Sequence, residues 1–252
     1  MLNIVVPMAG RGSRFANAGY KMPKPLIDIH GHYMIDCVTK NITPKTPHRF
    51  IYLCLAEYLE KYNLADSLQK ISPNCIVVPV DKVTEGAACT VLLAEEFIDN
   101  DDALMIANSD QYIDADIDAY LSAQAGLDGL IMTMFGTETK WSFVSFDENN
   151  LVTMVLEKVP ISNEATVGIY NFARGRDYVT SARKMIERNL RVNNEFYVAP
   201  VYNMLIEDGG KIGFYNIGAV DAGMYGLGTP TDLEKFLDNP LSWKIFEGNQ
   251  ND

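Results

Sequence analysis

The chain has 252 residues, 48% of them hydrophobic and 21% charged, with 21 lysines and arginines against 33 aspartates and glutamates. This composition is that of a globular protein with room for a sizeable core. The net charge of −12 argues against nucleic acids and anionic membranes as partners, and no apolar run approaches the length of about 18 residues that crosses a bilayer. We therefore expect a cytoplasmic protein whose four cysteines, which form no C-x-x-C pair, are free thiols.

The first half of the sequence alternates short apolar runs with helix-like segments. The apolar runs, rich in β-branched residues, predict strands at 2–7, 49–55, 75–80, 103–108 and 129–135. Helices are expected between them at 33–42, 56–70, 86–98 and 116–125. Continuous apolar strands separated by helices indicate a mostly parallel sheet covered on both faces, which binds its ligands at the carboxyl ends of the strands.

The pattern changes after about residue 136. Residues 141–158 read as two strands joined by a polar turn at 147–150, and residues 166–172 read as another strand. Helices are expected over 176–190, over 198–207, and from Thr229-Pro230, where the threonine is placed as a cap. Because no linker divides the chain, we predict one α/β domain over 1–252 whose second half, 137–252, adds a mixed, partly antiparallel layer.

The stretch 5–26 contains four cations and no acid, although the protein as a whole is acidic. It follows a predicted strand, but it matches neither G-x-G-x-x-G, since Phe15 takes the third glycine position, nor the P-loop pattern. Its small residues would still let backbone N–H groups approach an anion, and they are Ala9, Gly10, Gly12 and Ser13. Arg14 and Lys24 can add charge. We interpret the stretch as an anion site; the alternative is a strand-to-helix turn with solvated basic residues.

The motif PMAGRGSRFANAGYKMPKPL, which begins at Pro7, resembles the signature G-x-G-[ST]-R…P-K-P-[LM] of the sugar-1-phosphate nucleotidyltransferases, also called NDP-sugar pyrophosphorylases. The resemblance implies a glycosyltransferase-A-like α/β fold and the coupling of a nucleoside triphosphate to a sugar phosphate with release of pyrophosphate. It implies that the glycine loop and Arg14 hold the triphosphate and that Lys24 contacts the phosphates where bonds change. The halves 1–136 and 137–252 would then bind nucleotide and acceptor.

Two further segments resemble nucleotide and metal sites of that family. TEGAACTVLLA (84–94) resembles the segment that reads the base, so Thr84, Glu85 and Gly86 would surround the ring. Without the resemblance, this segment is interpreted equally well as a helix that starts at Gly86. ANSDQY (107–112) resembles the family's G-D-N, which makes Asp110 a ligand of Mg²⁺, a cation that prefers carboxylate oxygen. An aspartate in an ordinary turn is the alternative.

Three segments of the second half resemble the family's acceptor pocket. VLEKVP (155–160) resembles E-K-P, so Glu157 would contact sugar hydroxyls and Lys158 the sugar phosphate, although a solvated strand end is the alternative. Gly168 in TVGIYNF would allow close approach of the acceptor, and NEFYVAP would supply Glu195 nearby.

The sequence departs from the family where D-x-G-T is usual, because Gly226 stands where that motif has its metal-binding aspartate. Asp221 is close in sequence and is our candidate for the second metal ligand. The departure also leaves the acceptor open.

The leading hypothesis is a nucleotidyltransferase that makes an NDP-sugar, for surface polysaccharide precursors, from a nucleoside triphosphate and a sugar 1-phosphate. A rival is a cytidylyltransferase-type enzyme acting on a choline, polyol or amino-acid phosphate. A third hypothesis, from another class, is a catalytically silent nucleotide-binding regulator. A glycosyltransferase would use a D-x-D motif, which Asp114 and Asp116 match only in form. The base and the oligomeric state stay open.

Overall fold

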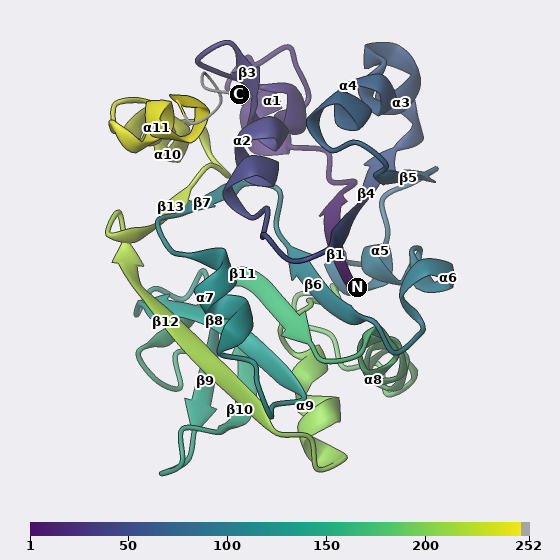
Figure 1. Ribbon diagram of the computed structural model, residues 1–252, viewed down its shortest axis with the longest axis vertical. Helices are drawn as coiled ribbons and strands as arrows, with labels where there is room; N and C mark the ends of the chain where they lie inside the picture. Colours follow the sequence, from purple (N-terminus) through teal and green to yellow (C-terminus); the bar gives the residue numbers. More distant parts are fainter. Residues whose placement is uncertain (248–252) are drawn as a thin grey trace.

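The computed structural model describes residues 1–247, and its main element is a mixed sheet that runs through the whole molecule (Figure 1). Along the sheet the order is β5 (Ile76–Val80), β4 (His48–Leu55), β1 (Leu2–Met8), β6 (Ala103–Ala107), β11 (Glu164–Phe172), β8 (Gly129–Phe135), β12 (Ile212–Val220), β13 (Gly223–Gly226) and β7 (Gln111–Ile113). The hairpin of β9 (Ser142–Phe146) and β10 (Val152–Glu157) joins it through β11. A separate two-stranded ribbon consists of β2 (Asp28–Ile29) and β3 (His32–Tyr33).

Four of the five strands expected in the first half are parallel neighbours, whereas the fifth, β8, lies beyond β11 in the sheet and is antiparallel to it. β1 pairs in parallel with β4 and β6, and β4 pairs in parallel with β5. Each strand carries hydrophobic residues on both faces because helices cover both faces. The helices of this half are α1 (Ser13–Asn17), the 3₁₀ turn η1 (Lys24–Leu26), α2 (Met34–Asn41), α3 (Ala56–Tyr62), α4 (Leu64–Ile71), α5 (Ala87–Leu92), α6 (Glu95–Ile98) and α7 (Ile117–Ser122).

Two long helices expected from the sequence are each broken in two. The predicted helix 56–70 is interrupted at Asn63, whose backbone is left-handed with φ 49° and whose side-chain amide donates to Asp66 at 2.7 Å. Asparagine enters this conformation more readily than other side chains, so the chain turns there. The predicted helix 86–98 is interrupted at 93–94. Helical periodicity continues through both breaks, so it could not reveal them.

The second half is antiparallel where the sequence predicts a change of pattern. β11 runs antiparallel to both β6 and β8, and its register shifts around Gly168, where the strand bulges. The expected hairpin forms over β9 and β10. Thr229 caps a helix as predicted, since its hydroxyl accepts from the backbone N–H of Asp232. The helices are α8 (Gly175–Glu187), α9 (Val201–Glu207), α10 (Pro230–Leu237) and α11 (Leu241–Glu247).

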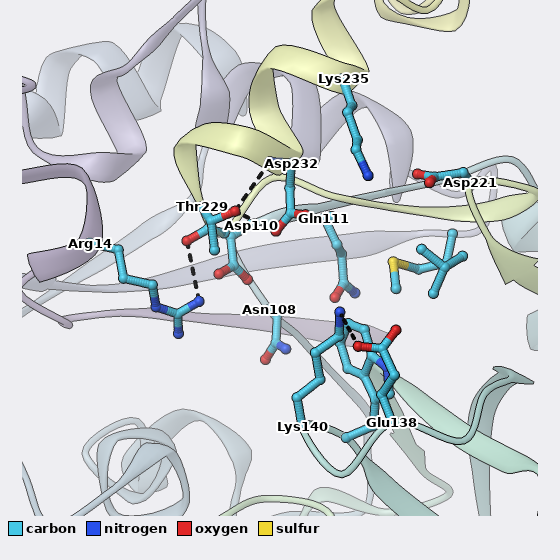
Figure 2. A pocket seen from close by; sticks show the side chains of 15 residues that line it. Arg14, Asn108, Asp110, Gln111, Glu138, Lys140, Asp221, Thr229, Asp232 and Lys235 are labelled. Atoms are coloured by element: carbon cyan, nitrogen blue, oxygen red, sulfur yellow. Dashed lines mark hydrogen bonds and ion pairs between the residues drawn. The ribbon is translucent and has the colours of Figure 1, made fainter. Parts of the chain in front are cut away.

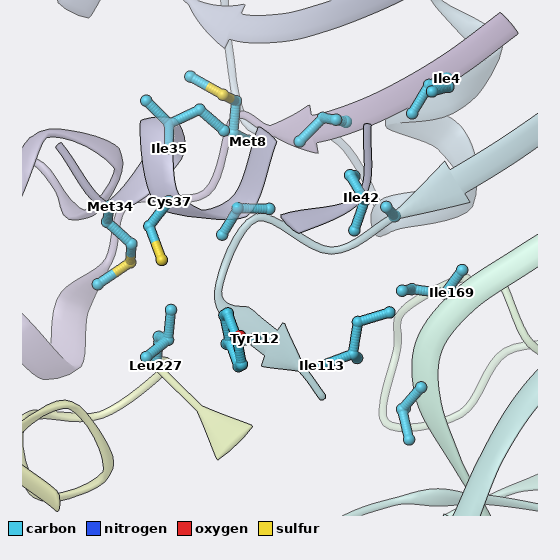
Figure 3. Close-up of a cluster of buried hydrophobic side chains, with 14 of the residues drawn as sticks. Ile4, Met8, Met34, Ile35, Cys37, Ile42, Tyr112, Ile113, Ile169 and Leu227 are labelled. Carbon is cyan, nitrogen blue, oxygen red and sulfur yellow. The ribbon is translucent and has the colours of Figure 1, made fainter. Parts of the chain in front are cut away.

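The core has one layer on each face of the sheet. Alternate residues of β1 show this: Ile4 and Met8 pack into one layer, which contains α2 (Figure 3). Val5 packs into the other layer, which contains residues of α8 and α9. Because packed side chains and helices fill both faces of the sheet, the edge that is left for a ligand is the one at the carboxyl ends of β1 and β6. Within residues 1–247, no helix is long and apolar enough to cross a bilayer.

Candidate active site

Four neighbouring cavities lie around the carboxyl ends of β1 and β6. The central cavity, of about 150 Å³, is lined by Gly12, Ser13, Arg14, Lys24, Asp110 and Gly228. On one side is a cavity of about 260 Å³ whose lining includes Ala9, Gly10, Lys24, Thr84, Gly86 and Glu195, which we call the loop cavity. On the other side are the hairpin cavity, of about 260 Å³, which reaches Glu157 and Gly168, and a larger outer cavity of about 600 Å³ beside α10. Arg14 lines the central, hairpin and outer cavities.

The glycine loop folds back onto the segment that carries Lys24. Gly12 has a left-handed backbone with φ 60°, and a Cβ there would lie 3.1 Å from the Lys24 Cβ. A side chain at this position would therefore be strained and would push the two segments apart. Pro23 and Pro25 hold the backbone around Lys24, which begins η1. The loop thus fixes where the lysine side chain starts.

The cationic side chains at residues 14 and 24 share the central cavity with Asp110. The Lys24 Nζ lies 3.0 Å from Asp110 Oδ2, and both side chains keep about a quarter or less of their surface exposed, at 20% and 26%. The Arg14 guanidinium donates to the Gly228 carbonyl at 3.5 Å (Figure 2). The sequence places these residues on three separate segments, and the fold brings them to one cleft.

The segment expected to read the base is held by its own hydrogen bonds. The Thr84 hydroxyl contacts the Gly86 carbonyl at 2.9 Å and the Thr90 hydroxyl at 2.6 Å. Gly86 has φ 133°, and a Cβ there would clash with the Phe196 backbone, so its lack of a side chain serves packing. The Glu85 carboxylate is 65% exposed and pairs with Arg191 at 3.0 Å. Thr84 and Gly86 therefore line the loop cavity, whereas Glu85 turns to Arg191.

The predicted acceptor residues occupy different positions. Glu157 is 6% exposed, lines the hairpin cavity with Gly168 and accepts a hydrogen bond from the Ser142 hydroxyl. Burial raises the pKa of Glu157, and the Ser142 hydrogen bond and the Lys158 charge only partly oppose this. Lys158 reaches the cavity wall indirectly, since its Nζ donates to the hydroxyl of Tyr197 at 2.9 Å. Glu195, expected beside the acceptor, lines the loop cavity.

Several lining residues were not anticipated from the sequence. The outer cavity also contains Asn108, Gln111, Lys140, Trp141, Asp232 and Lys235. Asn108 lies two residues before Asp110 and Gln111 directly after it, so their place in ANSDQY, near the predicted metal ligand, was the available signal. Asp232 lies three residues after Thr229, the cap of the helix. At this spacing an acidic residue is expected to belong to the helix cap rather than to a binding site.

Comparisons with known proteins decide the family. The sequence model described as nucleotidyl transferase matches residues 4–199. The chain belongs to this nucleotidyl transferase family. A search of curated proteins finds no match to the chain.

Solved structures show that this nucleotidyltransferase has the expected glycosyltransferase-A-like fold. A nucleoside-diphosphate-sugar pyrophosphorylase from Vibrio cholerae RC9 is 25% identical, with a TM-score of 0.83 over 94% of this chain and 100% of that one. An inositol-1-phosphate CTP transferase from T. maritima is 18% identical, with a TM-score of 0.76 over 98% and 96% of the chains. A UDP-glucose pyrophosphorylase from Acinetobacter baumanii is 17% identical, with a TM-score of 0.72 over 99% and 95%. The last two similarities show the fold alone.

Gly226, where the nucleotidyltransferase departs from the D-x-G-T pattern, faces another carboxylate. A Cβ built at Gly226 would lie 3.6 Å from Asp232 Oδ2, so the Asp232 side chain reaches the place from which residue 226 would project. The Thr229 hydroxyl donates to that oxygen at 2.6 Å. The same segment touches Asp110, because the Leu227 N–H donates to the Asp110 carbonyl at 2.8 Å. Asp221 lies across the outer cavity from Asp110 (Figure 2).

Proposed function

We propose that this nucleotidyltransferase transfers a nucleotide from a nucleoside triphosphate to a sugar 1-phosphate, giving an NDP-sugar and pyrophosphate. The observation that carries the proposal is the central cavity, where Arg14 and Lys24 meet Asp110. It lies between the loop cavity, which we assign to the nucleotide, and the hairpin cavity, which we assign to the acceptor. We further propose that the reaction takes place in the cytoplasm and that its product is a precursor of surface polysaccharide.

The proposed chemistry requires charge neutralisation more than proton transfer. A phosphate monoester has a second pKa near 6, so its oxygen is largely dianionic at neutral pH and attacks the α-phosphorus without a general base. Two anions must nevertheless approach each other and pyrophosphate must leave. Arg14 and Lys24 would bind and orient the triphosphate in line with the acceptor, while backbone N–H groups of the glycine loop hold its oxygens.

The residues present fit a magnesium ion, which would add positive charge to the phosphates. Mg²⁺ is usually held by one or two carboxylates together with substrate phosphates. Asp110 and Asp232 meet this requirement, because both carboxylates face the 226–228 segment: a Cβ at Gly228 would lie 2.7 Å from Asp110 Oδ2, and one at Gly226 would lie 3.6 Å from Asp232 Oδ2. Asp232 is therefore a second candidate ligand beside Asp221, the candidate drawn from the sequence.

A second candidate function is transfer to a cyclitol phosphate, another polyhydroxylated ester. The fold similarity to the inositol-1-phosphate CTP transferase favours it, as does the hairpin cavity, whose lining combines Glu157, Asn108 and Ser142. Carboxylate, amide and hydroxyl groups suit hydroxyls that both donate and accept hydrogen bonds. A choline phosphate, which carries no such hydroxyl, is disfavoured.

The test is release of pyrophosphate by the purified protein. ATP, GTP, CTP, UTP and dTTP would each be combined with α-D-glucose 1-phosphate, α-D-mannose 1-phosphate, myo-inositol 1-phosphate and phosphocholine. Release with a sugar 1-phosphate supports the proposal, and release with inositol phosphate alone supports the second candidate. Release with phosphocholine alone contradicts both. Nucleotide binding without release from any pair would favour the silent regulator.

A further inference from the structure

Gln111 presents a buried amide group to the outer cavity. The residue is 6% exposed, yet it lines this cavity directly beside Asp110. Its Nε2 has no hydrogen-bond partner among residues 1–247. Buried amide groups almost always have partners, so a buried donor that faces a cavity points to an oxygen that arrives with a ligand.

The bulge of β11 holds the amide in place. Gly168 has φ 86°, and a Cβ there would lie 2.7 Å from Gln111 Oε1 and would clash with the Asn108 amide. The bulge is fixed in turn by a hydrogen bond from the Asn108 N–H to the Gly168 carbonyl at 2.9 Å. The Oε1 atom of the Gln111 amide therefore packs against the bulge at Gly168. Figure 2 shows the amide directed into the cavity, toward the side of Asn108 and Lys140.

Gly226, which lies opposite Gln111, adds no side chain of its own, and the space that its Cβ would enter borders Asp232 Oδ2 at 3.6 Å. β7 and β13 are antiparallel, and Gln111 is the register partner of Gly226. Side chains of directly opposed residues project to the same face of a sheet about 4.5–5.5 Å apart. An aspartate at position 226 would therefore place a carboxylate within reach of the Gln111 amide. The glycine leaves that donor to a ligand, so the departure at 226 and the unpartnered amide are parts of one arrangement.

A second unpartnered donor borders the same space. The Nε1 of Trp141 is buried without a partner in the described chain, and this residue lines both the hairpin and the outer cavity. Asn108 also lines both, so the two cavities share a wall. An acceptor that extends from Glu157 toward Asp110 would pass these donors. We propose that Gln111 determines acceptor specificity, its Nε2 donating a hydrogen bond to a hydroxyl oxygen of the phosphate ester.

This inference rests on the proposed function and is tested with the nucleotide and ester that the wild type turns over fastest in the panel above. Gln111→Leu removes the donor with little change of shape, and Gln111→Glu replaces it with an acceptor. We expect both to raise KM for the ester about tenfold, the loss of one hydrogen bond to a polar partner, and to leave KM for the nucleotide within about twofold.

The matched control is Gln124→Leu. Gln124 also has an Nε2 without a partner among the residues that the structure describes, but it lies beside the amino end of β1, in a different pocket. This variant should keep both KM values.

Deoxy analogues of the ester provide a second readout that does not depend on folding losses. The wild type should lose efficiency with the analogue that lacks the recognised hydroxyl, and Gln111→Leu should show no further loss with that analogue. Unchanged KM for the ester, a rise confined to the nucleotide, or equal sensitivity of wild type and variant to every analogue would overturn the inference while leaving the proposed function intact. Absence of pyrophosphate release by the wild type would instead remove the proposed function, and the inference with it.

Discussion

The Lys24 ammonium lies 3.0 Å from the Asp110 carboxylate, which joins the start of η1 to the segment that follows β6. Each group neutralises the other in the free protein. In the proposed complex both would exchange partners, the lysine taking phosphate oxygens and the aspartate a cation. The ion pair thus keeps two opposite charges in one cavity before either substrate arrives.

Replacement of Lys24 by methionine tests that exchange. Lys24→Met keeps the length of the side chain but removes its charge, so we expect kcat to fall about a hundredfold or more, as when one preorganised donor is lost from a transition state. Steady-state kinetics measures the change. Lys21→Met is the matched control, because Lys21 is exposed in the same loop. Full kcat in Lys24→Met would contradict the role proposed for this lysine.

Arg14 offers a second test with a control in the same loop. Arg14→Ala should lower kcat by about a hundredfold to a thousandfold, or about 3–4 kcal/mol of transition-state stabilisation. Arg11→Ala removes the same charge from a neighbour that lines none of the four cavities, so it should stay within about threefold of the wild type, since solvent screens a charge that lies outside the site. Equal losses in the two variants would indicate that only the overall charge of the loop matters.

The sequence was sufficient to predict the framework of the fold and to single out Arg14 and Lys24, which the fold brings to one cavity. The strands could be predicted because their apolar runs are continuous, and Arg14 and Lys24 because they lie in a stretch without acids. The break at Asn63 was hidden, since helical periodicity continues across it. Contacts between residues that are far apart in the chain also could not be predicted from the sequence. Gly86 packs on the Phe196 backbone, and Gln111 faces Gly226, in each case over about a hundred residues of chain.

Asp232 and Asp221 give different expectations for the metal. If Asp232 is the second ligand, Asp232→Asn should weaken Mn²⁺ binding in the presence of nucleotide by about tenfold or more, whereas Asp221→Asn should not. Electron paramagnetic resonance of free Mn²⁺ measures this without turnover. The reverse pattern would assign the second ligand to Asp221, as the sequence suggested.

Glu157 predicts a dependence of stability on pH. Burial raises the pKa of Glu157 above its ordinary value of 4.5, so the folded protein binds this proton more tightly than the unfolded chain does. Stability is therefore lost as the pH rises through the raised pKa. Glu157→Gln removes the ionisation and can still accept from Ser142. Its Tm should exceed that of the wild type at pH 7–8, and the difference should shrink toward pH 4.5. Thermal unfolding followed by circular dichroism tests this, and a Tm difference that does not vary with pH would contradict it.

Gly86 predicts a loss of stability that is separate from catalysis. An alanine there must hold φ 133° and place its Cβ against the Phe196 backbone, which cannot move aside as a flexible side chain could. The backbone strain alone is worth about 1–3 kcal/mol, and the clash adds to it. Gly86→Ala should therefore lower the free energy of unfolding measured with urea by at least this amount. Gly10→Ala is the control, because no atom of the described residues lies within 4 Å of a Cβ at Gly10. If Gly86→Ala were as stable as Gly10→Ala, the contact between this segment and Phe196 could not be as close as the structure has it.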